Sequence, residues 1–151
     1  MKTVITGGAG FIGCNVAAHA LRAGDQVVIL DNLARPGARP NAQWLSSHHQ
    51  PGDRALSSPG AGQLLPAWAG VSVYVGHYSE TLDYFQKIRN VGAVLKPGEP
   101  DTGVRAFLHD NGITLLYWGP DETLTGFQPA SQCYLEPIHQ EGAVTIYRVH
   151  W

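Results

Sequence analysis

The chain has few of the residues that build metal sites, disulfide frameworks or nucleic-acid interfaces. It contains only two cysteines, Cys14 and Cys133, which lie far apart with no C-x-x-C spacing, so neither a zinc site nor a disulfide framework is indicated. The seven histidines are scattered without metal-ligand spacing, and we expect no metal. A net charge of -2 gives no basic excess, which argues against nucleic acid as a partner.

Long apolar runs are also missing. The most apolar stretch, residues 64–75, is interrupted by Pro66 and Gly70 and is shorter than the roughly 18 residues of a membrane span. The N-terminus has only Lys2 before a short apolar run and glycines, which does not resemble a signal peptide. We therefore expect no membrane span and a cytoplasmic protein, either one ordinary domain or two small units sharing a core.

Glycine, by contrast, is plentiful near the N-terminus, where it separates a predicted strand from a predicted helix. Residues 3–6 form a β-branched run, apolar residues then recur at helical spacing from Phe11 towards Gly24, and residues 27–30 are apolar throughout, as in a strand covered on both faces. Between strand and helix stand Gly7, Gly10 and Gly13. This order predicts a βαβ unit over residues 1–45.

The spacing of the three glycines suits a dinucleotide site. Gly7 permits a tight turn, Gly10 lets the backbone approach a pyrophosphate, and Gly13 lets helix and strand pack closely. The amides at the start of the helix would face the phosphates. Asp31 follows the second strand, eighteen positions after Gly13, where a carboxylate can accept hydrogen bonds from ribose hydroxyls. Asp31 favours NAD over NADP, although the nearby Arg35 weakens that preference.

The same residues allow a simpler interpretation. The glycines could only form a tight turn from strand to helix, and Asp31 followed by Asn32 could be ordinary turn chemistry. Both interpretations predict the same local backbone, so they differ only in whether a dinucleotide binds.

The segments ITGGAGFIG and VVILDNLARPGARPNAQWL resemble the start of NAD-dependent epimerase/dehydratase proteins, in the extended short-chain dehydrogenase/reductase family that acts on nucleotide sugars. The stretch from Asp31 to Gly37 looks especially like CDP-sugar 2-epimerases. The resemblance implies NAD as cofactor, a nucleotide sugar as a possible second partner, and a cofactor site lined by Gly7, Gly10, Phe11, Ile12, Gly13, Asp31, Asn32 and Arg35.

The resemblance does not extend to catalysis. That family uses a Tyr-x-x-x-Lys pair, in which lysine lowers the tyrosine pKa, and no tyrosine here has lysine four positions later. Tyr84 and Lys87 are three apart, and the pattern favours core packing for Tyr84 and a solvated Lys87. We therefore assign no catalytic residue and predict NAD binding without complete catalytic machinery. An active epimerase with Tyr78 or Tyr84 as an unconventional base stays open.

The second half begins after a segment rich in Ser, His, Gly and Pro, which we interpret as a linker over residues 46–63. Residues 64–151 then show alternating elements. Strands are predicted at 71–75 and 113–118, helices at 80–95 and 102–110, and a hairpin at 133–138 and 144–149. The expected fold is α/β, with a Rossmann-like βαβ start and a mostly parallel sheet. The second α/β segment ends in a β-hairpin, and a sheet shared with the first segment stays open as an alternative.

The segments LPAWAGVSVYVGHYSETLDYFQKIRNV, GITLLYWGPDE and YLEPIHQEGAVTIYRV resemble the soluble C-terminal region of polytopic membrane glycosyltransferases of the lipid-linked sugar donor type. In such proteins the catalytic acids lie in a membrane domain, so no catalytic role passes to this chain, and Asp83, Asp121 and Glu122 are interpreted as caps and surface charges. The two resemblances suggest a chimeric or truncated gene product. A structural or interaction domain is the third hypothesis, and an oligomer is possible.

Overall fold

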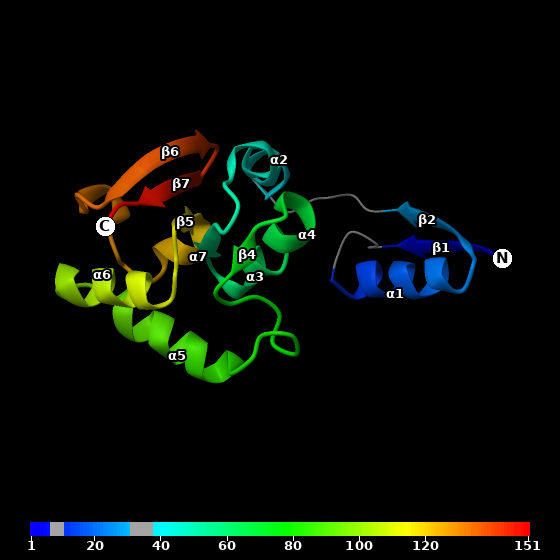
Figure 1. Ribbon diagram of the computed structural model, residues 1–151, viewed down its shortest axis with the longest axis horizontal. Coiled ribbons are helices and arrows are strands. Elements are labelled where there is room, and N and C mark those ends of the chain that lie inside the picture. Colours follow the sequence, from blue (N-terminus) through cyan, green and yellow to red (C-terminus); the bar gives the residue numbers. More distant parts are fainter. Residues whose placement is uncertain (7–10, 31–37) are drawn as a thin grey trace. The chain divides into compact units, whose positions relative to one another are not determined.

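The first of two compact units is a small βαβ unit. The computed structural model describes residues 1–6, 11–30 and 38–151, and the chain divides between Pro36 and Gly37. The first unit contains β1 (Lys2–Thr6), α1 (Phe11–Arg22) and β2 (Gln26–Leu30), labelled in Figure 1. β1 and β2 pair in parallel. The predicted order of strand, helix and strand is therefore present.

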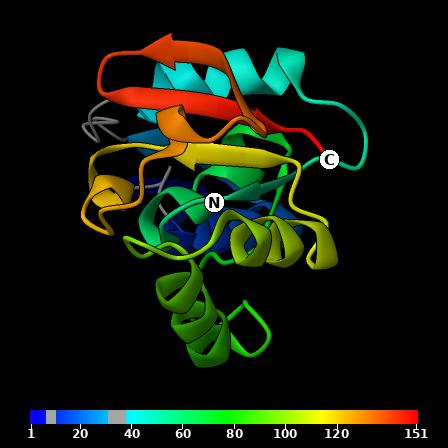
Figure 2. The same cartoon turned by 90° about the vertical axis from the view of Figure 1, so that its left-hand side faces the viewer.

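The second unit is built on a five-stranded sheet with strand order β4-β3-β5-β7-β6 (Figure 2). β3 pairs in parallel with β4 and β5, whereas β7 pairs antiparallel with β5 and β6. With β1 and β2, three of the five described pairings are parallel. The elements of this unit, in chain order, are α2 (Ala38–His48), β3 (Arg54–Leu56), α3 (Pro59–Gly62), α4 (Leu65–Ala69), β4 (Ser72–Val73), α5 (Tyr84–Val94), α6 (Asp101–Asp110), β5 (Leu115–Trp118), α7 (Pro120–Thr123), the 3-10 helix η1 (Pro129–Ser131), β6 (Leu135–Glu141) and β7 (Val144–Val149).

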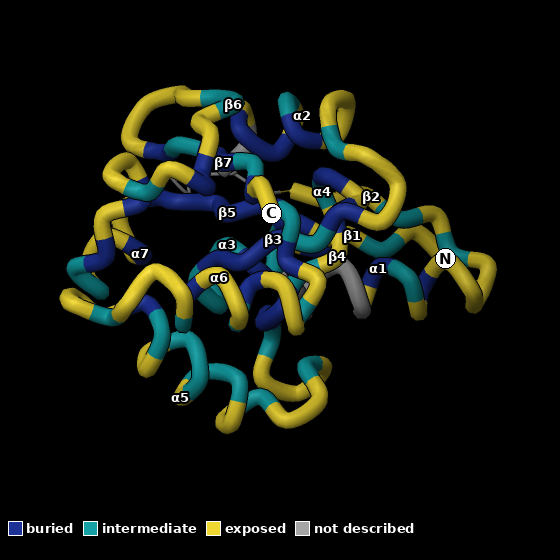
Figure 3. Tube along the Cα trace, turned by 60° about the vertical axis from the view of Figure 1, so that its left-hand side comes forward, coloured by how far each residue is buried: buried dark blue, intermediate teal, exposed yellow. Residues whose placement is uncertain are grey.

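Strand β5 is the centre of this unit, because both of its faces are covered. Leu116 and Trp118 belong to an apolar cluster with residues of α5 and α6, and Leu115 and Tyr117 belong to a second cluster with residues of α2 and α4. The side chains alternate between the two faces as strand geometry requires. All four residues are buried, as the tube coloured by burial shows (Figure 3). Trp118 is thus a core residue.

The α/β class and the C-terminal hairpin are confirmed, and α6 lies where helical spacing placed it. Other boundaries differ from expectation. Helix α5 starts at Tyr84, later than predicted, and Asp83 before it has a left-handed backbone (φ 56°) and makes no side-chain capping bond. Strand β4 is only two residues long. The apolar run 71–75 predicts a longer strand than the two residues that pair with β3 at this edge of the sheet.

Residues 46–63, interpreted as a linker, instead contribute to the core of the second unit. They contain the end of α2, all of β3 and helix α3, and Leu56 of β3 is completely buried. The two sheets are also separate, since β1 and β2 pair only with each other among the described residues. The sequence does not indicate strand β3, because three residues are too few for a periodic pattern and the strand follows Pro51 and Gly52.

The carboxylate of Asp53, directly before β3, binds the residue directly before β5 and a residue of β7. It accepts hydrogen bonds from the Gln50 amide at 2.7 Å, the Thr114 hydroxyl at 2.7 Å and the Arg148 guanidinium at 2.6 Å. Burial by itself raises the pKa of Asp53, but these three hydrogen bonds and the positive charge of Arg148 outweigh it and hold the pKa below its usual value. Asp53 is therefore a buried anion stabilised by its partners.

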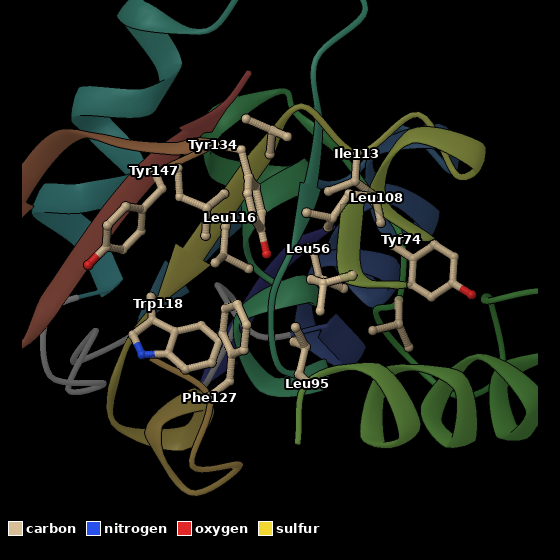
Figure 4. Close-up of a cluster of buried hydrophobic side chains, with 14 residues drawn as sticks. Leu56, Tyr74, Leu95, Leu108, Ile113, Leu116, Trp118, Phe127, Tyr134 and Tyr147 are labelled. Carbon is tan, nitrogen blue, oxygen red and sulfur yellow. The ribbon is translucent and has the colours of Figure 1, made fainter. Parts of the chain in front are cut away.

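The side chain of Tyr134 is buried in the same cluster as Leu116, and its hydroxyl has no hydrogen-bond partner among the described residues. Figure 4 shows the hydroxyl pointing into the cluster, on the side of Leu56 and Leu116. Burial raises the pKa of Tyr134 to about 12, and the nearby Asp101 contributes to the rise while Arg105 opposes it. The hydroxyl is therefore protonated at neutral pH and unsatisfied.

We expect Tyr134→Phe to stabilise the second unit by about 1 kcal/mol, because the substitution removes an unsatisfied buried hydroxyl and keeps the ring. The measurement is the urea midpoint, followed by tryptophan fluorescence. Tyr78→Phe, at an exposed position, serves as the control and should leave the midpoint unchanged. A Tyr134→Phe midpoint below that of the wild type would contradict the prediction.

The two outer strands of this sheet are poor partners for any further strand. β4 has two residues, and β6 carries Pro137, with an irregular register between Pro137 and His139. Proline cannot donate a ladder hydrogen bond, and bulges turn an edge away. Within the ranges that the structure describes, no helix has the length and apolar character needed to cross a membrane.

Candidate nucleotide-binding site

The first unit brings the ends of two parallel strands to one edge. Thr3 pairs with Val27, Ile5 with Ile29, and Thr6, the last residue of β1, with Leu30, the last residue of β2. Four residues separate the end of β1 from the start of helix α1. The carboxyl edge of parallel strands, next to the start of the connecting helix, is where α/β folds bind phosphate-containing ligands.

The opposite edge is fixed by hydrogen bonds around Asp25. Its carboxylate lies 3.0 Å from the N-terminal ammonium of Met1 and accepts a 3.0 Å hydrogen bond from the Thr3 hydroxyl. The preceding Gly24 has φ 82°, which lets the chain turn sharply from α1 into β2. These contacts hold the starts of β1 and β2 together, so the parallel register is set from this end.

Some of the residues predicted to line the cofactor site lie within the described residues, and others lie outside them. Phe11, Ile12 and Gly13 lie in the first turn of α1, where we describe the backbone only. Gly7, Gly10, Asp31, Asn32 and Arg35 lie outside the described residues. Gly7 directly follows Thr6 in the sequence, and Asp31 directly follows Leu30, the two residues that pair at the ends of the strands.

Helix α1 covers one face of the two-stranded sheet. Ile5 of β1 is buried, as are Ala17 and Ala20 of α1, and small side chains allow a helix to approach a sheet closely. Unpaired amides in the first turn of a helix and its macrodipole together favour an anion. This geometry can bind a phosphate group by backbone contacts alone, without a basic side chain.

The other face of this sheet is apolar and uncovered within the first unit. Val4 and Val28 pair directly and therefore point to the same side, together with Leu30; their exposed fractions are 55%, 38% and 55%. We expected residues 27–30 to be covered on both faces. They are not: Val28, Ile29 and Leu30 are all exposed, because α1 is the single helix in the described part of this unit.

Comparison with known proteins finds a sequence similarity for the N-terminal part of the chain, which includes the first unit and the start of the second. Residues 3–65 match the NAD dependent epimerase/dehydratase family. Over 47 residues, the chain is 53% identical to CDP-paratose 2-epimerase from Salmonella typhi. That alignment covers 31% of this chain and 14% of the epimerase. The resemblance to nucleotide-sugar epimerases is confirmed for this part of the chain, and the aligned stretch spans about one seventh of that relative.

Comparison of folds gives a different neighbour. The chain is similar to the C-terminal globular domain of an oligosaccharyltransferase from Archaeoglobus fulgidus, with a TM-score of 0.52 and 10% sequence identity. The similarity covers 73% of this chain and 94% of that domain, far more than the first 36 residues could supply. It confirms a glycosyltransferase-like C-terminal region at the level of the fold.

The two tyrosines considered as unconventional bases both lie in the second unit. Tyr78 is exposed, and the half-buried Tyr84 packs against the apolar cluster that contains Leu116. The side chain of Lys87 is half-buried, with its ammonium 5.2 Å from the ring centroid of Tyr74. Tyr84 thus has the packing role that the sequence favours, while Lys87 lies over an aromatic ring instead of being fully solvated.

Among the acidic residues interpreted as caps and surface charges, Glu122 is more deeply placed than the sequence indicates. Glu122 is buried, and its carboxylate accepts hydrogen bonds from the backbone amides of Gly119, at 2.8 Å, and Ser58. It therefore joins the loops that follow β3 and β5. Among the residues that the structure describes, no group of three or more potential metal ligands comes together.

Proposed function

We propose that the first unit binds NAD at the carboxyl edge of β1 and β2. The observation that carries the proposal is the paired end of the two parallel strands, Thr6 with Leu30, together with helix α1, which begins at Phe11. The 53% identity to CDP-paratose 2-epimerase over 47 residues supports it. The pyrophosphate would lie against the first turn of α1.

In this proposal each residue of the cofactor site has a distinct role. Gly7 and Gly10 keep the loop free of side chains where the pyrophosphate approaches, and Gly13 permits close packing of α1 on the strands. The carboxylate of Asp31 accepts hydrogen bonds from the adenosine ribose and repels a 2′-phosphate, which favours NAD over NADP. Phe11, Ile12, Asn32 and Arg35 complete the lining.

The proposed activity is binding and not turnover. A Tyr-x-x-x-Lys pair is absent from the sequence, so the proton transfer that accompanies hydride transfer in the epimerases has no evident base. A nucleotide sugar is a possible second ligand of the same edge. If Tyr78 or Tyr84 were an unconventional base, addition of CDP- or UDP-sugars with NAD would change the absorbance of NADH.

Asp31→Ala is expected to weaken NAD binding about tenfold or more, since charged hydrogen bonds to the ribose contribute about 1.5–3 kcal/mol. The measurement is isothermal titration of the purified chain with NAD and with NADP. Asp110→Ala is a matched control, because Asp110 is an exposed carboxylate of the second unit. Saturable heat with NAD, weaker binding of NADP, and unchanged binding by the control variant are the expected results.

The absence of saturable heat with NAD would overturn the proposal and favour the second candidate, a structural or interaction domain with an empty glycine turn. That candidate is supported by the second unit, whose fold resembles a globular domain of an oligosaccharyltransferase and which contains both large apolar clusters. Equal NAD affinity of the wild type and Asp31→Ala would place the binding site elsewhere.

A further inference from the structure

The second unit contains a cavity of about 230 Å³ that the preceding proposal does not use. Its floor is formed by Leu56 at the end of β3 and Leu116 of β5, two residues of the buried cluster drawn in Figure 4. Its wall is formed by Ile88, Val91 and Gly92 of α5. The cavity thus lies beside the carboxyl ends of two parallel strands, the position where open α/β sheets bind ligands.

The cavity exists because α5 packs loosely. No residue of this helix is fully buried, although Ile88 and Val91 pack against the cluster. Gly92 lies in the part of α5 that lines the cavity, and a Cβ atom built on it would meet no atom within 4 Å. Gly92 is itself exposed, so a larger side chain has room at this position beside the cavity.

Most of the lining surface is apolar, and the polar residues of the lining are Ser57, Ser58, Asp121, Glu122 and Thr125. Asp121 is exposed, whereas Glu122 is buried. The oxygens of Glu122 accept hydrogen bonds from the Ser58 and Gly119 amides, which hold this carboxylate in the lining, and Asp121 adds an exposed carboxylate. These charges repel an anionic ligand and attract a cation or a hydrogen-bond donor.

We propose that this cavity binds a small amphiphile with one apolar chain or ring and a neutral or cationic head group. An apolar cavity of about 150 Å³ is large enough to bind benzene, so this cavity accommodates a ring or a chain of several carbons. The apolar part lies on Leu56 and Leu116, and the head group lies beside Asp121. The proposal does not depend on NAD binding, because every lining residue belongs to the second unit.

The test compares three ligands that differ only in the head group: 1-octanol, octylammonium and octanoate. Binding to the full chain is followed at pH 7 by backbone amide chemical shifts. Octanol and octylammonium are expected to shift amides of α5 and of the loop after β3, and octanoate to bind at least fivefold more weakly. Asp121→Asn is expected to strengthen octanoate binding severalfold and to leave octanol unchanged.

Gly92→Leu is the blocking variant, since leucine fills the open volume and is also a better helix former than glycine. It is expected to weaken octanol binding at least tenfold. Ala93→Leu is the matched control, because Ala93 is the next residue of α5 and is exposed outside the lining. It should bind octanol within twofold of the wild type. Circular dichroism and the urea midpoint check that both variants fold.

Three results would overturn the proposal: no amide shifts with 1 mM octanol, octanol binding by Gly92→Leu equal to the wild type, or octanoate binding as tightly as octanol. If Gly92→Leu did not fold, the head-group comparison and Asp121→Asn would still decide it. Asp121 is exposed, so its substitution is not expected to disturb folding.

Discussion

Gly62→Ala is expected to destabilise the second unit by about 3 kcal/mol or more. Gly62 ends α3, and a Cβ atom built on it would overlap the carbonyl oxygen of Val75 and lie 3.1 Å from the Val75 carbonyl carbon. It would also lie 3.2 Å from the Cα atom of Gly76. These atoms are backbone, which cannot move aside as a flexible side chain can, so the cost is at or above the upper end of overpacking in a core.

Gly60→Ala is the matched control, because Gly60 lies in the same short helix. A Cβ atom there would lie 3.5 Å from the nearest side-chain oxygen, an ordinary contact. The expected change in unfolding free energy is below about 0.5 kcal/mol, as for most unstrained substitutions. Urea unfolding followed by tryptophan fluorescence measures both variants. Equal midpoints for Gly60→Ala and Gly62→Ala would show that α3 does not pack on Val75 as described.

Asp53→Ala is expected to cost about 3–5 kcal/mol, since it leaves the Arg148 guanidinium partly buried without its carboxylate. The hydroxyl of Thr114 and the amide of Gln50 lose their acceptor as well. The double variant Asp53→Ala with Arg148→Met should lose less unfolding free energy than the sum of the losses in the two single variants. Additive losses would mean that the two side chains do not interact.

The stability of the wild type should also depend on pH through Asp53. Its pKa is lower in the folded state than the usual 3.8. Protonation therefore opposes folding, and the stabilisation is complete above about pH 4 and is lost as the pH falls through the lower, folded-state pKa. Urea midpoints should lose this contribution below about pH 4, so between roughly pH 4 and pH 2 they should fall more steeply for the wild type than for Asp53→Ala. Parallel curves would contradict this.

The part of the fold that could be predicted from the sequence is the part with repeating spacing. The βαβ unit was visible because the run Thr3–Thr6, the helical pattern after Phe11 and the run Val27–Leu30 each extend over several residues. Helix α6 and the hairpin of β6 and β7 were visible for the same reason. Local spacing reports local structure, and these elements are long enough to show it.

The parts that could not be predicted depend on contacts between distant residues. Strand β3 is three residues long, and its burial depends on β4 and β5, which follow much later in the chain. Asp53 and Arg148 are 95 positions apart, so nothing near either residue indicates the ion pair. The cavity beside α5 arises from how a helix packs on a sheet, and no single residue indicates it.

The candidate cofactor site illustrates a different limit. Its glycines and Asp31 were identified from spacing and resemblance, and the parallel pairing of β1 and β2 agrees with the expected backbone. Whether a dinucleotide binds depends on the loop residues between these elements and on what covers Val4 and Val28. The spacing of the glycines predicts the path of the backbone at such a site, whereas the affinity for NAD depends on side chains and contacts that spacing does not encode.

The sheets of the two units differ in how readily their edge strands could pair with a strand of another copy. In the second unit both outer strands are unsuited to receive a further strand. In the first unit, β1 and β2 each have one side without a partner strand in the described part of the chain, and both are rich in β-branched residues. If copies of this protein aggregate by strand addition at high concentration, residues 2–6 and 26–30 are where it would start.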